Sequence, residues 1–89
     1  MKPYRIKHVP TGLYYKPGGE VNLTKNGKVY TTGVNAFNYF TRGYIPVGAR
    51  KGSKLHLSTQ NIIAWLPVAY YSWKVSACIP IEQFVKEEI

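Results

Sequence analysis

The sequence predicts an α+β fold in which a small, mostly antiparallel sheet has one short helix packed against it. Two observations carry this prediction. Residues 4–32 contain short β-forming segments separated by two turn signals, Pro10–Gly12 and Asn26–Gly27. Residues 34–42 instead place apolar side chains at helical spacing. A chain of 89 residues is long enough for a single domain, 1–89, with one modest core.

The first turn is expected to close a β-hairpin. Tyr4, Ile6 and His8 would lie on one face of an extended strand, with basic side chains between them on the other face. Residues 10–12 combine the fixed φ of proline with a glycine that is free to take φ > 0, which favours a tight reversal. Leu13–Tyr15 would return as a second strand, because its aromatic residues suit a half-buried sheet.

The second turn signal predicts another hairpin. Asn-Gly is typical of a type I′ turn, in which both central residues have φ > 0. Asn26 and Gly27 would therefore join strands over residues 21–24 and 28–32. Residues 16–20, which contain two glycines, are predicted to be a loop.

The predicted helix covers residues 34–42. Val34, Phe37 and Phe40 would share one side of this helix and pack on the sheet. Gly43 is typical of the position that follows the C-terminus of a helix.

The next segment is predicted to mix loop, strand and a helical turn. Residues 44–52 are expected to be a loop with strand character at 45–47. Alternating apolar residues over 55–57 indicate one more strand. Residues 58–61 have the composition to cap a helical turn that continues through Trp65.

The clearest long strand is predicted over residues 69–79. Apolar side chains recur at every second position from Tyr71 to Ile79, so one face would lie on the core and the other near solvent. Cys78 would be a small core or cross-strand residue in this strand. Residues 81–89 fit either a short amphipathic helix or an acidic terminal strand, and the sequence leaves both open.

The charge distribution favours a polyanionic partner. Twelve Lys and Arg face four Asp and Glu, and three of these four acids lie in the last eight residues. Residues 1–81 therefore carry eleven cations against Glu20 alone, a formal charge of +10. Such a field attracts nucleic acid, an anionic membrane surface or an acidic protein, although a basic surface also serves solubility alone. No membrane association is expected, since the longest apolar run, 62–71, is short and contains a proline.

Interleaved tyrosines favour nucleic acid among these polyanions, because rings stack on bases while cations contact phosphates. Tyr14 and Tyr30 are the candidate stacking rings. The densest basic cluster, 50–54, is predicted to be a loop that closes on a phosphate backbone, with a plain exposed turn as an equal alternative. The predicted nucleic-acid contacts are Arg5, Lys7, Tyr14, Lys25, Lys28, Tyr30, Arg50, Lys51, Lys54 and Lys74.

Catalytic and metal-binding residue types are scarce. Two histidines with one cysteine make a poor ligand set, and no pair of acids is placed for acid–base work, so we expect no enzyme activity, no metal and no cofactor. The one enzymatic alternative is a metal-free ribonuclease in which His8 or His56 acts as acid or base. His8 shares a predicted strand face with Tyr4 and Ile6, where a packed histidine is commoner than a catalytic one.

Composition also bears on assembly and compartment. Thirteen aromatic residues are many for this length, so some rings are expected at the surface or at an interface. Free edges on the tyrosine-rich strands would allow a homo-oligomer, and we expect a dimer. A single cysteine excludes an internal disulfide and no secretory signal is visible, which fits a reducing cytoplasm.

The runs RIKHVPTGLYY (5–15) and NLTKNGKVY (22–30) resemble the opening of small proteins encoded by T-even-type tailed phages. That pattern is close to R-I-K-H-x-P-T-G-L-Y-Y, a variable loop, then N-L-S/T-K-x-G-K-V-Y, and it covers about a quarter of the chain. The resemblance implies an RNA-binding, antitoxin-like protein that inhibits a host endoribonuclease such as the ToxN toxin of a type III toxin–antitoxin system. The positions it carries over as RNA contacts are Arg5, Lys7, Lys25 and Lys28.

The predicted function is therefore that of a small, basic, non-enzymatic phage protein that binds nucleic acid, with RNA favoured over DNA. It would counteract a host nuclease or defence complex in the host cytoplasm. An inhibitor that binds an acidic host protein without nucleic acid is the alternative.

Overall fold

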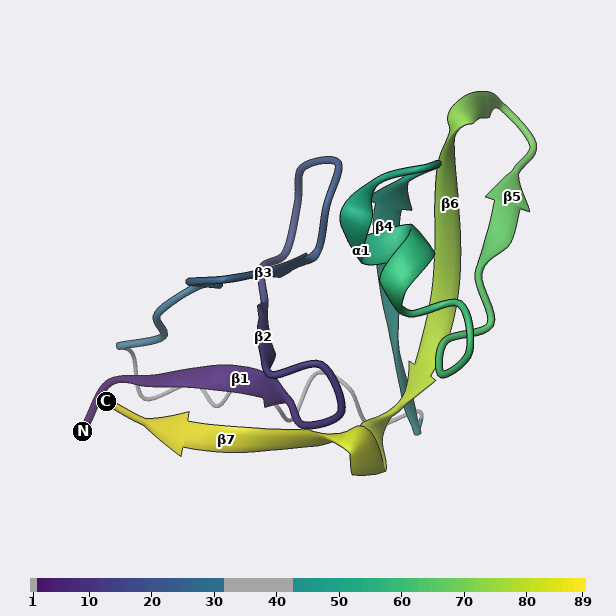
Figure 1. Ribbon diagram of the computed structural model, residues 1–89. Helices are drawn as coiled ribbons and strands as arrows, with labels where there is room; N and C mark the ends of the chain where they lie inside the picture. The colour runs from purple at the N-terminus through teal and green to yellow at the C-terminus, as the bar shows by residue number, and fades with distance from the viewer. Residues whose placement is uncertain (1, 32–42) are drawn as a thin grey trace.

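The computed structural model describes residues 2–31 and 43–89. Strands dominate these residues, with one α-helix and one 3₁₀ turn among them (Figure 1). In chain order the elements are β1 (Tyr4–His8), β2 (Leu13–Tyr15), β3 (Leu23–Thr24), β4 (Tyr44–Arg50), α1 (Lys54–Ser58), β5 (Leu66–Val68), β6 (Tyr71–Pro80), η2 (Ile81–Gln83) and β7 (Phe84–Glu88).

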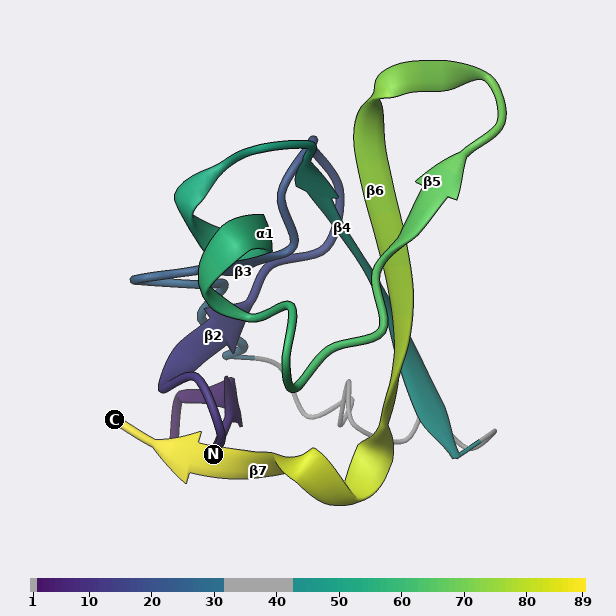
Figure 2. The ribbon, with the colours of Figure 1, turned by 45° about the vertical axis from the view of Figure 1, so that its right-hand side comes forward.

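The strands form two antiparallel sheets. Sheet A has the order β3-β2-β1-β7 and sheet B the order β4-β6-β5, and neighbouring strands pair antiparallel throughout. This confirms the predicted α+β class with mostly antiparallel β structure, although the strands divide between two sheets. β6 continues through η2 into β7, so one stretch of chain belongs to both sheets (Figures 1 and 2).

The hydrophobic core joins the inner faces of the two sheets. Sheet A contributes fully buried side chains such as Ile6, and sheet B contributes Ile45. Leu55 of α1 and Trp65 pack against this core while staying partly exposed. Among the described residues, the buried apolar residues of the core are Tyr4, Ile6, Tyr15, Leu23, Ile45, Val47, Ala49, Ile63, Val75, Ala77, Ile79 and Phe84.

The first predicted hairpin is confirmed. β1 and β2 pair antiparallel, and buried residues alternate with half-buried ones along β1. Tyr4, Ile6 and His8 face the core, as the sequence alternation predicts. Gly12 has a φ of 73°, and its N–H donates to the His8 carbonyl across the turn (2.8 Å).

The second predicted hairpin is wrong. β3 pairs with β2, whereas Tyr30 forms an isolated bridge with Tyr4. Gly27 has the predicted positive φ (64°), but Asn26 does not, so the turn is not of type I′. The Gly27 N–H donates to the Thr24 hydroxyl (2.8 Å), and the chain folds back across β2 instead of pairing with β3.

Residues 44–58 also differ from the prediction. The expected loop over 44–52 contains strand β4, every residue of which is paired with β6. The predicted strand at 55–57 is part of helix α1. Ser53 caps this helix, because its hydroxyl accepts a hydrogen bond from the His56 N–H. Alternating apolar residues over only three positions fit a strand and a single helical turn equally well. Here the Ser53 cap favours the helix.

The predictions for the following segments have mixed outcomes. The helical turn expected from 58–61 through Trp65 is present in part. The Ile63 N–H donates to the Thr59 carbonyl four residues back (2.8 Å), as in one turn of a helix, but no helix extends from there to Trp65. The helix predicted over 34–42 lies outside the described residues.

The C-terminal third agrees better with the sequence. β6 places Val75, Ala77 and Ile79 in the core, as the alternation predicts. The C-terminal residues form strand β7, which pairs with β1. Of the two alternatives for this segment, helix or strand, the strand is therefore correct. Cys78 lies opposite Pro46 and is exposed, so of its two predicted alternatives, core or cross-strand residue, the cross-strand one is correct.

The two tyrosine-rich strands are not edges. β2 lies between β3 and β1, and β6 lies between β4 and β5. The free edges on which the predicted homodimer was based are therefore absent from these two strands. The dimer itself stays a prediction.

Asn22 joins the two sheets. Its backbone N–H donates to the Gly48 carbonyl of β4 (3.1 Å), and its Oδ1 accepts from the Gly48 N–H (2.8 Å). Its Nδ2 donates to the carbonyls of Lys16 (2.9 Å) and Gly18 (3.1 Å). One side chain thus closes the 16–22 loop and covers part of the β4 edge.

Replacing Asn22 with alanine should lower the free energy of unfolding by about 2 kcal/mol, because three side-chain hydrogen bonds are lost and the buried Gly48 N–H loses its acceptor. Urea unfolding followed by circular dichroism measures the change. Asn61→Ala, at an exposed turn position, is the matched control. Equal stability of the two variants would contradict the role given to Asn22.

Candidate nucleic-acid interface

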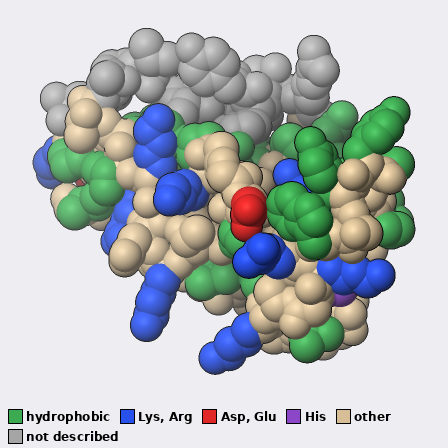
Figure 3. Space-filling model, turned by 90° about the horizontal axis from the view of Figure 1, so that it is seen from above, with side chains coloured by type: hydrophobic (Ala, Val, Ile, Leu, Met, Phe, Trp, Pro, Cys, Tyr) green, Lys and Arg blue, Asp and Glu red, His purple; other side chains and the backbone are tan. Residues whose placement is uncertain are grey.

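The predicted contact residues do not form one surface. They divide into four groups: on the outer face of sheet A (Arg5, Lys7, Tyr14), beside Tyr4 (Lys28, Tyr30), at the far end of sheet B (Arg50, Lys51, Lys74) and around a pocket (Lys25, Lys54). Figure 3 shows basic side chains spread over one face of the molecule, with apolar side chains between them.

On the outer face of sheet A, Glu87 compensates the predicted cations. Its carboxylate lies 3.5 Å from Lys7 Nζ and 3.9 Å from Arg5 Nη2, and it accepts a 2.6 Å hydrogen bond from the Tyr14 hydroxyl. That hydrogen bond is the main cause that lowers the pKa of Glu87 and raises the pKa of Tyr14. Arg5 Cζ also lies 4.1 Å from the centre of the Tyr14 ring. Glu87 therefore engages all three predicted contact residues on this face, although Arg5 Nε is buried there without a hydrogen-bond partner.

Tyr30 is packed against the core. Its ring stacks on buried Tyr4, with 5.4 Å between ring centres, and Lys28 Nζ lies 5.1 Å from its centre. Burial is the main cause that raises the pKa of Tyr30. A base that stacked on this ring would have to compete with these contacts, so Tyr30 is a poorer stacking residue than the sequence predicts.

Three predicted cations lie at the far end of sheet B, and the side chain of one of them, Lys74, runs along β4 to Gly48. Arg50, Lys51 and Lys74 form what we term the basic rim. Arg50 lies opposite Lys74 in the β4–β6 register, and the Lys51 N–H donates to the Trp73 carbonyl (2.8 Å). Arg50 Nε is 3.3 Å from the Glu20 carboxylate, in an ion pair open to solvent. Within residues 2–31 and 43–89, Lys51 and Lys74 have no carboxylate partner.

Three exposed aromatic residues lie at the same end of sheet B. Tyr70, Tyr71 and Trp73, which we term the ring platform, are 92%, 50% and 40% exposed. The Tyr71 and Trp73 ring centres are 5.5 Å apart, and their planes are inclined by 55°. Arg50 Cζ lies 5.7 Å from the centre of the Trp73 ring, so the platform and the rim are in contact.

The ring platform is exposed because β6 extends past the end of β4. The pairing of the two strands stops at Lys74, whereas β6 begins at Tyr71. Beyond that point β5 pairs with β6 through Val68 opposite Tyr71. The β5–β6 hairpin therefore projects from the rest of the molecule, as its loop at the top of Figures 1 and 2 shows.

The sequence prediction missed this platform. The sequence places Tyr71 and Trp73 on the core-facing side of the long strand, whereas both are exposed and the buried positions of β6 begin at Val75. The error lies in where the core ends, which depends on the length of β4 rather than on β6 itself. The turn at Arg50–Gly52 marks that end, whereas the sequence indicates only a basic cluster there.

His8 is a packed residue. It is fully buried, with Nδ1 2.8 Å from Thr11 Oγ1 and Nε2 2.8 Å from Gln83 Oε1. A neutral imidazole has one donor and one acceptor nitrogen, and these partners satisfy both. Burial lowers the pKa of His8, and the Gln83 hydrogen bond acts weakly in the opposite direction. The ring is inaccessible to a substrate, which argues against its use as a catalytic acid or base.

Stability should fall as the pH drops below about 6.5, because His8 is neutral in the folded state. In that range the unfolded chain takes up a proton on His8 that the folded chain does not, so acid favours unfolding. Urea unfolding at about pH 7.5 and about pH 5.5 measures the effect. His8→Gln should remove it, whereas the Glu87 carboxyl acts only below about pH 4.5. An unchanged pH dependence in His8→Gln would contradict this assignment.

The described part of the chain contains no helix long and apolar enough to span a membrane. Nor do the residues outside 1 and 32–42 include a group of three or more His, Cys, Asp or Glu arranged to hold a metal ion.

No family model, curated protein or solved structure matches this chain significantly. The resemblance to phage proteins therefore stays a prediction. Several residues of the resembling runs have structural roles: His8, Thr11 and Gly12 build the first turn, and Asn22 and Gly27 hold the second run against β4 and β2. These roles account for much of the pattern without reference to a function.

Proposed function

We propose that this protein binds single-stranded nucleic acid, RNA in preference to DNA, through the ring platform and the basic rim. The observation that carries the proposal is the contact between exposed rings and cations at the far end of sheet B. An exposed ring that stacks on an unpaired base contributes about 1–3 kcal/mol, and neighbouring cations neutralise the phosphates.

The platform suits unpaired bases better than a duplex. The Tyr71 and Trp73 rings are inclined to each other, and Tyr70 is almost fully exposed, so each ring offers its own face to a splayed base. Contacts to ring faces and phosphates tolerate many sequences. The preference for RNA is supported only by the resemblance of residues 5–15 and 22–30 to phage proteins.

The same resemblance supports a role as a phage protein that counteracts a host nuclease or defence complex in the host cytoplasm. A pull-down from host cells, with and without nuclease treatment, tests this role. A host nuclease whose retention falls when the RNA is degraded is the expected result. A partner that is retained after nuclease treatment, with no bound RNA, would favour the alternative of a direct inhibitor of an acidic protein.

Affinity for a single-stranded oligonucleotide should fall with salt, with a slope on a log–log plot of about −0.7 for each phosphate neutralised. Lys51→Gln and Lys74→Gln should each flatten the slope by about 0.7 and weaken binding to all sequences alike. Glu20→Gln should steepen the slope, because it releases Arg50 from its ion pair. Fluorescence anisotropy at several salt concentrations measures these slopes.

Lys16→Gln is the control, since Lys16 is an exposed lysine outside the rim. Rim variants that change the slope no more than Lys16→Gln would remove the basic rim from the interface.

A further inference from the structure

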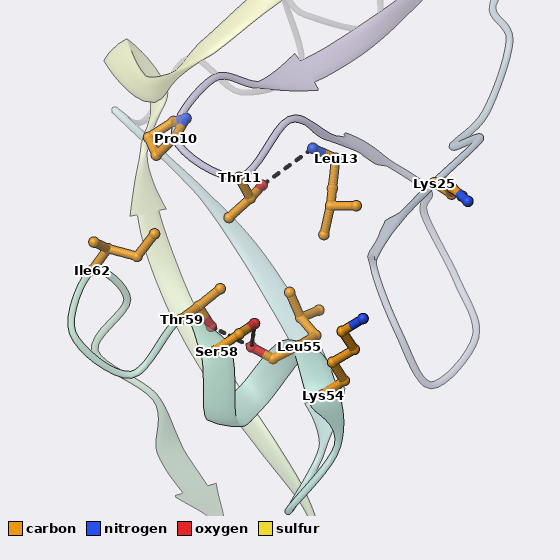
Figure 4. A pocket seen from close by; sticks show the side chains of 9 residues that line it. All are labelled: Pro10, Thr11, Leu13, Lys25, Lys54, Leu55, Ser58, Thr59 and Ile62. Carbon is orange, nitrogen blue, oxygen red and sulfur yellow. Dashed lines mark hydrogen bonds between the residues drawn. The ribbon is translucent and has the colours of Figure 1, made fainter.

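A pocket of about 580 Å³ lies between the first hairpin and helix α1, and it shares no residue with the ring platform or the basic rim (Figure 4). The β1–β2 turn forms one wall and α1 with the turn after it forms the other. In Figure 4 the side chains of Leu13 and Leu55 point toward one another across the pocket, and Ile62 closes one side.

The hydroxyl groups in the walls already have partners. Thr59 Oγ1 donates to the Leu55 carbonyl (2.6 Å) and accepts from the Trp65 Nε1–H (2.8 Å). Thr11 Oγ1 bonds with His8 Nδ1 (2.8 Å) and accepts from the Leu13 N–H (3.3 Å). These walls therefore have little capacity to bind the polar edge of a nucleic-acid base, and they favour an apolar group.

Two lysines border the same pocket. Lys25 and Lys54 lie on one side of it, and both are exposed (Figure 4). Among residues 2–31 and 43–89, no carboxylate pairs with either ammonium group, whereas Arg5, Lys7 and Arg50 are paired with Glu87 or Glu20. An apolar pocket with two uncompensated positive charges at its border is complementary to an apolar side chain flanked by acidic groups.

We propose that this pocket binds an acidic peptide segment of a partner protein. An apolar side chain of the segment would lie between Leu13 and Leu55, and its carboxylates would pair with Lys25 and Lys54. A nucleotide fits less well, because its base would place polar groups against apolar walls. Since the site is separate from the ring platform, peptide binding and nucleic-acid binding can be lost independently of each other.

The test uses the full chain and a fluorescein-labelled peptide in which one leucine stands between pairs of aspartates. We expect saturable binding that is lost when the leucine is replaced by serine or the aspartates by asparagines. The double variant Lys25→Gln/Lys54→Gln should weaken binding about tenfold, since two exposed ion pairs are removed. Lys2→Gln/Lys16→Gln removes the same charge elsewhere and should change binding little.

A second variant addresses the apolar contact. Ile62→Ser alters a half-exposed side chain at the border of the pocket, so the fold should survive while peptide affinity falls several-fold. Equal affinity of wild type and the Lys25/Lys54 double variant would overturn the proposal, as would displacement of the peptide by adenosine monophosphate with greater affinity than by unlabelled peptide. Trp73→Ala should bind the peptide normally, so failure of this proposal and failure of the nucleic-acid proposal give different results.

Discussion

Replacing Gly27 with alanine should destabilise the fold by about 2–4 kcal/mol. Gly27 has a φ of 64°, a conformation that is unfavourable for residues with a Cβ atom. Its backbone also packs directly against β2. A methyl group there would overlap Tyr14 Cβ, and it would come within 3.1 Å of the Tyr14 carbonyl carbon and the Tyr15 oxygen. β2 is paired on both sides, with β1 and β3, so these atoms have little freedom to move away.

Gly12 provides the matched control for this variant. It has a similar φ of 73°, but a Cβ there would meet no atom within 4 Å. Gly12→Ala should therefore cost only the conformational part, about 1 kcal/mol. Urea unfolding of both variants measures the difference. Equal losses would show that the close packing of residue 27 on Tyr14 does not exist.

Replacing Trp73 with alanine should weaken binding of single-stranded RNA by about tenfold to a hundredfold, which corresponds to about 1–3 kcal/mol. The variant removes a stacking surface and no charge, so the salt dependence should stay nearly unchanged. Tyr71→Ala should act in the same direction, since the two rings adjoin. Fluorescence anisotropy with a labelled oligonucleotide measures both variants.

Tyr44 is the control ring for this series. It is 45% exposed, close to the exposure of Tyr71, but it lies at the opposite end of β4 from Arg50. Tyr44→Ala should leave RNA affinity unchanged. A larger loss in Tyr14→Ala than in Trp73→Ala would move the interface to the outer face of sheet A, where the sequence prediction places its first contacts.

Local signals in the sequence predict local structure well. The proline–glycine turn that ends at Gly12 and the alternation around Val75 and Ala77 both correspond to observed elements. The partner of each strand is harder to predict, because it depends on residues far away in the chain. β3 pairs with β2 because the Gly27 turn folds back across that strand, and no pattern within 21–32 indicates this.

In the candidate site, too, local features are predictable from the sequence, whereas features that depend on distant residues are not. The cations of the basic rim were predicted, because charge is visible in the sequence. The compensation of Arg5 and Lys7 was not, because Glu87 reaches them only through the pairing of β7 with β1, the two ends of the chain. The exposure of Trp73 was missed for a similar reason, since it follows from where β4 ends.

The most direct test of the central proposal is the fluorescence of Trp73 during titration with a short single-stranded RNA. The chain has two tryptophans, so Trp65→Phe leaves Trp73 as the single reporter. Stacking of a base on its ring should quench the emission saturably at low salt, and added salt should reverse the quenching. Emission that stays unchanged while RNA binds would place the interface elsewhere. The absence of any binding at low salt would contradict the proposed function itself.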